Sequence, residues 1–122
     1  MSGVNKPKFG IFKNVTYAMQ GAVTVLKSEK SFKTQLVVIA AIGLVLLFLN
    51  FSTVTKLVLF FSTWIILVAE AFNSAIERVV DLVTQDYHQL AKEAKDIGSF
   101  GVLLAFILIV AIWFVTIYLE FN

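Results

Sequence analysis

The sequence contains no cysteine and one proline, and only 15% of its 122 residues are charged. The missing cysteines exclude a disulfide scaffold and thiol chemistry. Soluble domains carry about 25% charged and about 45–50% apolar residues, whereas 59% of this chain is hydrophobic and its mean hydropathy is +0.88. That apolar content also excludes disorder. We therefore expect an integral membrane protein whose single domain covers residues 1–122.

The common sequence signatures of nucleotide-binding and hydrolytic enzymes are also missing. There is no GxxxxGK[ST] loop, no GxGxxG after a strand and no Ser/His/Asp arrangement. The lysines are not interleaved with aromatic residues, so we expect no nucleic-acid partner. If the protein uses ATP, it binds the nucleotide without a phosphate loop.

Long apolar runs predict an all-α fold with three transmembrane helices. They cover residues 32–51, 55–77 and 97–119. Each run reaches about 20 residues, which is enough to cross a bilayer core near 30 Å. Trp113 and Tyr118 lie towards the end of the third run, and rings of this kind favour the membrane interface.

The placement of lysine predicts the orientation. Six lysines precede residue 36, against the single acid Glu29. Because positive flanks stay in the cytoplasm, the N-terminus is expected inside, the turn at 50–56 outside and the polar segment 78–96 inside. No short apolar run with a small-residue cleavage site occurs near Met1, so we expect no removable signal peptide.

Residues 8–30 predict an amphipathic surface helix. Its apolar side chains fall within an arc of about 100° and are Phe12, Val15, Met19, Ala22, Val23 and Leu26. Such a helix lies in the plane of the membrane interface. A simple membrane anchor would account for this pattern but not for Glu29, the one acid in a basic segment. Glu29 is therefore a candidate functional residue.

The second predicted span carries a polar face. At 100° per residue, Glu70, Asn73, Glu77 and Asp81 share one narrow side of the helix. Glu70 lies about 20 Å along the helix from Leu57, below the cytoplasmic boundary. A carboxylate inside a membrane costs about 2.5–3.5 kcal/mol, which favours a functional site. The alternative is a neutral Glu70 that hydrogen-bonds to Asn73 and joins helices.

The spacing along this face limits what the two glutamates can do. Glu70 and Glu77 are separated by about 10 Å along the axis, so they cannot easily share one metal ion. A deep carboxylate near a lipid headgroup and a shallow one near a charged soluble ligand fit the spacing better. One three-helix chain has little interior in which to hide this face, so we expect an oligomer.

The polar segment before the third span combines charges of both signs. Lys92 and Glu93 are expected in a solvated link, and His88, the only histidine, on the surface. Lys95 has two interpretations, since a lysine at this place meets an anionic phosphate or simply extends to the headgroups. Small residues that follow predict close helix packing, and they are Gly98, Ser99 and Gly101.

Two stretches resemble one family closely. Residues 70–81, EAFNSAIERVVD, and residues 86–99, DYHQLAKEAKDIGS, are similar to the bacterial integral-membrane diacylglycerol kinases. The signature E-x-x-N-[ST]-A-I-E-x-x-V-D followed by A-K-D is long and unusual, and the resemblance covers nearly the whole chain. It implies a homotrimer in the bacterial inner membrane whose active sites form between subunits. It further implies Mg²⁺-dependent transfer of phosphate from ATP to diacylglycerol, a step of phospholipid metabolism.

The resemblance also assigns roles to single residues. Glu70 matches the catalytic base and Asn73 its polar neighbour, while Glu29 and Glu77 match the acids that hold magnesium on the nucleotide. The positions that match nucleotide contacts are Tyr17, Glu29, Glu77, Asp86, Tyr87, His88, Lys95 and Asp96. The positions that match lipid-substrate contacts are Asn14, Val15, Thr16, Tyr17, Ala18, Met19, Ser31, Phe32, Lys33, Thr34, Gln35, Phe48, Leu49, Asn50, Phe51, Glu70 and Ser99.

One departure and three alternatives accompany this interpretation. The family often has an arginine near the position of Gly10, and here the nearest cations are Lys8 and Lys13. The same family includes undecaprenol kinases, although the context around Lys95 is more similar to the diacylglycerol branch. Taken alone, an intramembrane Glu70 also fits a small proton-relay or ion-translocating subunit. Purely structural assembly is the third alternative, against which the polar face argues.

Overall fold

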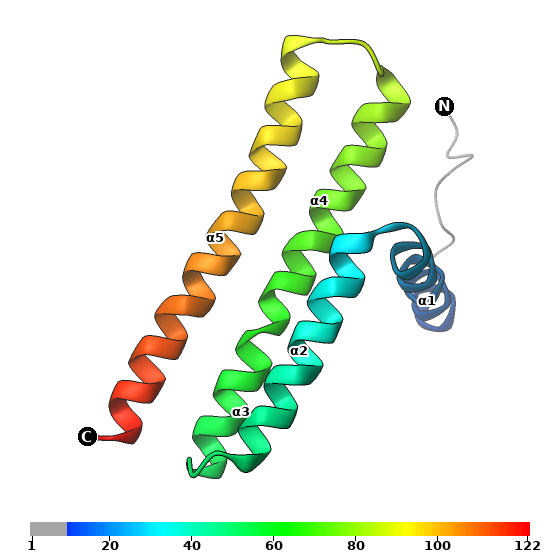
Figure 1. Ribbon diagram of the computed structural model, residues 1–122. Coiled ribbons are helices and arrows are strands. Elements are labelled where there is room, and N and C mark those ends of the chain that lie inside the picture. Colours follow the sequence, from blue (N-terminus) through cyan, green and yellow to red (C-terminus); the bar gives the residue numbers. More distant parts are fainter. Residues whose placement is uncertain (1–9) are drawn as a thin grey trace.

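A computed structural model describes residues 10–122, and in this part of the chain there are five helices and no strand (Figure 1). The helices are α1 (Ile11–Ser28), α2 (Lys30–Phe48), α3 (Thr53–Ser62), α4 (Trp64–Val83) and α5 (Gln89–Glu120). Three helical segments are long and apolar enough to cross a membrane, and they are Lys30–Phe48, Thr53–Val83 and Gln89–Glu120. The all-α membrane fold is confirmed.

Helices α3 and α4 form one membrane-length segment with an irregularity at Thr63. This residue keeps a helical backbone, with φ −64° and ψ −21°. Its hydroxyl donates to the carbonyl of Phe60 at 2.5 Å, and the hydroxyl of Ser62 donates to the carbonyl of Leu59 at 2.8 Å. Serine and threonine hydroxyls that bond to the preceding turn compete with the helical ladder, which explains the interruption.

Helix α5 begins earlier than the predicted third span. The backbone N–H of Leu90 donates to Nδ1 of His88 at 3.1 Å, so His88 caps the helix. Within the first turns, the side-chain amide of Gln89 donates to Glu93 at 3.0 Å, and Lys92 pairs with the carboxylate four residues on. The prediction of a link at residues 92–93 is therefore wrong, although both side chains are exposed.

Helices α4 and α5 make the most extensive contact in the bundle, and α2 packs against α3 and α4 (Figure 1). The α4–α5 contact is close at Gly98, where a Cβ atom would meet the side chains of Asn73 and Ile76. A Cβ at Gly101 would meet open space. The predicted small-residue packing surface thus holds for Gly98 and not for Gly101.

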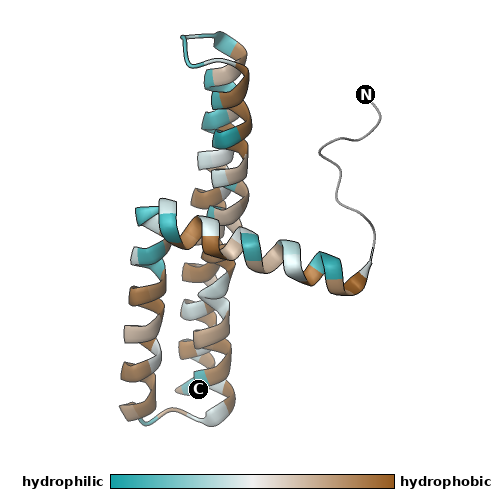
Figure 2. Ribbon diagram, turned by 90° about the vertical axis from the view of Figure 1, so that its right-hand side faces the viewer, coloured by the Kyte–Doolittle hydropathy of each residue, from teal (hydrophilic) through white to brown (hydrophobic). Residues whose placement is uncertain are grey.

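Helix α1 extends sideways from the bundle (Figure 2). None of its residues is buried, and hydrophilic and hydrophobic residues occur along its whole length. The helix ends at Ser28, and Glu29 takes an extended backbone, with φ −107° and ψ 105°, before α2 starts. Glu29 therefore forms the corner between α1 and the bundle. The predicted start at residue 8, with Lys8, lies outside the described residues.

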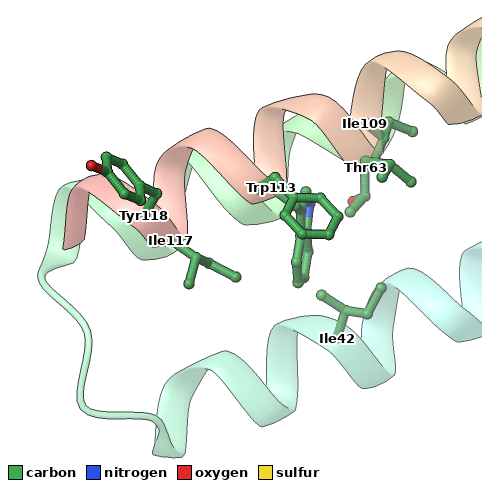
Figure 3. A pocket seen from close by; sticks show the side chains of 8 residues that line it. Ile42, Thr63, Ile109, Trp113, Ile117 and Tyr118 are labelled. Atoms are coloured by element: carbon green, nitrogen blue, oxygen red, sulfur yellow. The ribbon is translucent and has the colours of Figure 1, made fainter. Parts of the chain in front are cut away.

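An apolar cavity of about 620 Å³ separates α2 from the C-terminal half of α5 (Figure 3). Its lining residues are Ile42, Thr63, Ile109, Val110, Trp113, Phe114, Ile117 and Tyr118. The indole N–H of Trp113 donates to the hydroxyl of Ser62 at 3.1 Å. The polar edge of the Trp113 ring is thus bonded to a buried serine of α3.

At the α2–α3 end of the bundle, the Glu120 carboxylate ties α5 to the start of α3. It accepts hydrogen bonds from the backbone N–H of Ser52 at 2.6 Å, from the Ser52 hydroxyl at 3.1 Å and from the Thr55 hydroxyl at 2.7 Å. Ser52 also caps α3 by accepting from the N–H of Thr55 at 3.3 Å. Helix α2 stops at Phe48, before the predicted limit of residue 51, because the chain turns here to reach this cap.

Candidate active site

Three carboxylates converge on one small cavity of about 50 Å³, which we call the acidic cavity. Its lining residues are Val25, Glu29, Ser31, Phe32, Glu70, Asn73, Ser74 and Glu77. They come from the end of α1, the α1–α2 corner, the start of α2 and the middle of α4. The lone acid of the N-terminal segment and the polar face of the second span are thus brought together within one chain.

The helical repeat of α4 explains the grouping. Residues three, four and seven positions apart lie on one side of a helix, so Glu70, Asn73, Ser74 and Glu77 all reach the acidic cavity. Asp81, the fourth member of the predicted polar face, lies one turn further on and lines a different hollow. The polar face is therefore divided between two sites.

The polar groups of the acidic cavity are poorly satisfied. The Asn73 amide donates to Glu77 at 3.4 Å, a long hydrogen bond, and Asn73 Oδ1 is buried without a partner in the described part of the chain. Among the same residues no donor reaches the carboxylate of Glu70, and the charges of Glu29 and Glu77 act on it. The alternative in which Glu70 bonds to Asn73 is wrong, because Asn73 turns to Glu77.

A second hollow, of about 260 Å³, lies between the end of α4 and the start of α5, and we call it the α4–α5 hollow. It is lined by Val80, Asp81, Thr84, Gln85, Asp86, Tyr87, His88, Ala91, Lys92, Lys95 and Asp96. Lys95 pairs with Asp81 at 2.7 Å and Lys92 with Asp96 at 2.6 Å. All the nucleotide-contact candidates from the second half of the chain, apart from Glu77, therefore share one hollow.

Other candidates lie away from both sites in this chain. Tyr17 and the remaining residues of 14–19 are exposed along α1, and Ser99 is exposed on α5. Of residues 31–35, Ser31 and Phe32 line the acidic cavity, whereas Lys33, Thr34 and Gln35 do not. Residues 48–51 lie at the opposite end of α2, about 28 Å along the helix axis from its start. They cannot touch the acidic cavity of their own chain.

Residues 16–117 match the sequence model of the family described as prokaryotic diacylglycerol kinase. The chain belongs to this family. It is 32% identical over 112 residues to the diacylglycerol kinase of Escherichia coli K12, a match that covers 92% of each chain.

Other bacteria have similar proteins that are also named diacylglycerol kinase. The chain is 26% identical over 103 residues to the diacylglycerol kinase of Haemophilus influenzae, covering 84% of this chain and 87% of the relative. It is 36% identical over 94 residues to that of Synechocystis, covering 73% and 51%. This member of the diacylglycerol kinase family is therefore a membrane-bound lipid kinase that uses ATP, and the comparisons do not favour an ion-translocating subunit or an undecaprenol kinase.

The donor set of this kinase suits a metal ion that arrives with a nucleotide. Within residues 10–122 no three His, Cys, Asp or Glu side chains lie close enough to hold a metal ion by themselves. Mg²⁺ needs fewer protein ligands, because it is commonly bound by one or two carboxylates together with phosphates and water. Glu29 and Glu77 supply two carboxylates from different elements to one cavity. Glu29 and Glu77 therefore fit a Mg²⁺ ion that receives its remaining ligands from phosphates and water.

The sequence analysis missed two residues that contact Glu29. The hydroxyl of Ser74 donates to Glu29 Oε1 at 2.8 Å, and the guanidinium of Arg78 lies 3.5 Å from the same oxygen. Ser74 borders the polar face of α4, so helical geometry alone could have suggested it. Arg78 carries no such signal, because an arginine near the end of a span is usually a cation that extends to the headgroups.

Proposed function

We propose that this protein transfers the γ-phosphoryl group of ATP to the free hydroxyl of diacylglycerol and so forms phosphatidic acid and ADP. The hydroxyl oxygen attacks the γ-phosphorus, the bond from that phosphorus to the β–γ bridging oxygen breaks, and the hydroxyl proton passes to a base. The observation that carries this proposal is the acidic cavity, which combines Glu70, unpartnered among the described residues, with two further carboxylates. A hollow lined by lysines begins about one turn further along α4, at Val80 and Asp81.

Glu70 is the proposed base. No donor among the described residues neutralises its carboxylate, which leaves an oxygen free to accept the proton of the lipid hydroxyl. Asn73 is its proposed polar neighbour, and its buried Oδ1 packs beside Gly98 of α5. Glu70 lies one turn of α4 before Ser74 and two turns before Arg78, and these two residues contact the corner between α1 and α2. If α1 lies in the membrane interface, Glu70 lies at headgroup depth.

Glu29 and Glu77 are the proposed ligands of Mg²⁺ on the nucleotide. The ion neutralises phosphate charge when it is bound. Lys95 is proposed to pair with a phosphate in place of Asp81, since an ammonium group is a point charge that either anion attracts. The remaining proposed nucleotide contacts of the α4–α5 hollow are Asp86, Tyr87, His88 and Asp96.

We also propose a homotrimer with its N-terminus in the cytoplasm of a bacterial cell, in the inner membrane. Tyr17 lies outside both sites of its own chain, so its proposed nucleotide contact requires a neighbouring subunit. A neighbouring subunit is likewise needed for the proposed lipid-substrate contacts of Ser99 and of the exposed residues 14–19. Residues 48–51 are proposed to contact acyl tails, because only a long chain extending from the acidic cavity reaches the other end of α2.

Phosphorylation of lipid by the purified protein in mixed micelles tests this proposal. Labelled ATP and Mg²⁺ are supplied with diacylglycerol in one arm and undecaprenol in the other, and we expect label in diacylglycerol. Glu70→Gln should lower turnover by about 10²–10⁴-fold, the usual contribution of a general base, with the trimer retained on size exclusion. Retained activity in this variant would refute the base assignment, and label only in undecaprenol would refute the substrate.

A further inference from the structure

Arg78 is the only arginine in the sequence, and the proposed reaction has not assigned it a role. Its guanidinium donates to the hydroxyl of Ser28 at 2.5 Å and lies 3.5 Å from Glu29 Oε1. One turn earlier on α4, the hydroxyl of Ser74 donates to the same Oε1 at 2.8 Å. One hydrogen bond, from Ser74, and one ion pair, with Arg78, therefore hold one oxygen of Glu29 from the same side of α4.

The orientation of the Glu29 side chain depends on its contacts with Ser74 and Arg78. It is the single residue between α1 and α2, and its side chain makes no capping hydrogen bond to α2. Its side-chain partners in the described part of the chain are Ser74 and Arg78, which both belong to α4. Without these contacts, no side chain of the described residues would orient the Glu29 carboxylate, and only the backbone at the α1–α2 corner would.

The contacts are also selective for one oxygen. Both Ser74 and Arg78 engage Oε1, so Oε2 of Glu29 has no partner among residues 10–122. The side chain of Glu29 is 28% exposed and lines the acidic cavity with Glu70 and Glu77. Like charges around one cavity repel each other, which favours a cation there.

We propose that Ser74 and Arg78 are positioning residues that fix Glu29 Oε1, so that Oε2 is presented to the cation of the metal–nucleotide substrate. This inference rests on the proposed role of Glu29. Arg78 also bonds to Ser28, so it fixes the end of α1 and the carboxylate at the same time. The planar guanidinium suits this double contact better than an ammonium group does.

Magnesium titration of kinase activity tests the inference, with diacylglycerol and ATP held saturating. Ser74→Ala and Arg78→Gln should each raise the Mg²⁺ concentration for half-maximal activity by about tenfold or more, as removal of an orienting partner usually does. Turnover at saturating Mg²⁺ should fall by a smaller factor than the factor by which the Mg²⁺ requirement rises. Ser74→Thr should restore the wild-type titration, because the hollow of about 510 Å³ between α1 and α4, which Ser74 also lines, has room for a methyl group.

Lys27→Gln is the matched control for lost positive charge. Lys27 lies in the last turn of α1, one residue before Ser28, and its side chain is exposed. Its removal should leave the magnesium titration unchanged. In a Glu29→Gln background, Arg78→Gln should have little further effect, because two residues that act through one group are not additive.

Three outcomes would overturn the inference. Unchanged titrations in Ser74→Ala and Arg78→Gln, with a shifted titration in Glu29→Gln, would overturn it and leave the proposed function intact. A fall in thermal stability and turnover at an unchanged magnesium requirement would show a purely structural role. An unchanged titration in Glu29→Gln would remove the proposed role of Glu29 together with this inference. If Arg78→Gln does not fold, the comparison of Ser74→Ala with Ser74→Thr decides.

Discussion

Glu120, at one end of the bundle, differs sharply in its hydrogen-bond partners from Glu70 and Glu77, which lie in the middle of α4. Glu120 accepts three hydrogen bonds from Ser52 and Thr55, which tie the end of α5 to the start of α3. Glu77 accepts one long hydrogen bond from Asn73, and Glu70 has no donor among the described residues. Residue type alone therefore does not distinguish a structural carboxylate from a functional one.

The difference is in how many oxygen lone pairs each carboxylate leaves available for a ligand. A carboxylate that has several donors is held in place and stabilises the packing of the elements that supply them. A carboxylate without donors inside a membrane protein is costly, and it persists where a ligand or a proton completes its surroundings. Glu29 combines both properties, since Ser74 and Arg78 hold Oε1 while Oε2 has no partner among residues 10–122.

After Glu70→Gln, the largest effect is expected from Glu77→Gln. The variant keeps the shape of the side chain and loses the charge that is proposed to hold Mg²⁺. Catalytic efficiency should fall about 10²-fold or more, because removal of even an outer partner of a metal ligand costs 10–100-fold. Thermal stability should remain at the wild-type value, since the one hydrogen bond of Glu77 is long. A wild-type rate in this variant would contradict the role of the acidic cavity.

Gly98→Ala should have a smaller effect on the same cavity. The added methyl group would meet Asn73 Oδ1 and displace that side chain from its place beside Glu70 and Glu77. We expect turnover about tenfold lower, equivalent to about 1.4 kcal/mol in the barrier. Gly101→Ala is the control, because its Cβ meets open space. Equal rates in the two variants would show that the position of Asn73 does not matter.

Glu120→Ala should affect stability and leave catalysis unchanged. The three hydrogen bonds of Glu120 are solvent-exposed or only partly buried, so we expect a small fall in the free energy of unfolding. Thermal unfolding in detergent measures the loss, and kinase assays well below the midpoint should give the wild-type rate. A loss of activity at that temperature would mean that the two ends of the bundle are coupled.

The smallest effect is expected from Trp113→Phe. This change removes the hydrogen bond from the indole to Ser62, whose hydroxyl still donates to the carbonyl of Leu59. The free energy of unfolding should fall by about 0.5–1 kcal/mol, again without a change in turnover. A larger loss would show that filling the apolar cavity beside Trp113 matters more than its hydrogen bond (Figure 3).

Much of the site was predictable because it follows helix periodicity. The spacing of Glu70, Asn73 and Glu77 places them on one side of α4 in any helical structure, and they do line one cavity. Glu29 was also predictable as a candidate, since a lone acid in a basic segment has no role in anchoring. Its meeting with Glu70 was not, because that depends on the corner at which α1 joins the bundle.

Other features required the packing of separate elements. The pairing of Asp81 with Lys95 joins α4 to α5, and neither residue carries a local signal for the other. The start of α5 at Gln89 was missed because charges of both signs resemble a solvated link, whereas here they form pairs along the helix. Arg78 was overlooked because its partners belong to other elements, namely the end of α1 and the corner after it.

The sequence by itself determined that the chain crosses the membrane in helices, that one of these helices carries a polar face, and that the family signature lies on that face. These are properties of hydropathy and of a 3.6-residue repeat, which depend on neighbours along the chain. Only the tertiary structure decided which oxygen of Glu29 is held and which carboxylates are left without donors. Hydrogen bonds extend only about 3 Å, so they are set by how helices distant in sequence come to lie against one another.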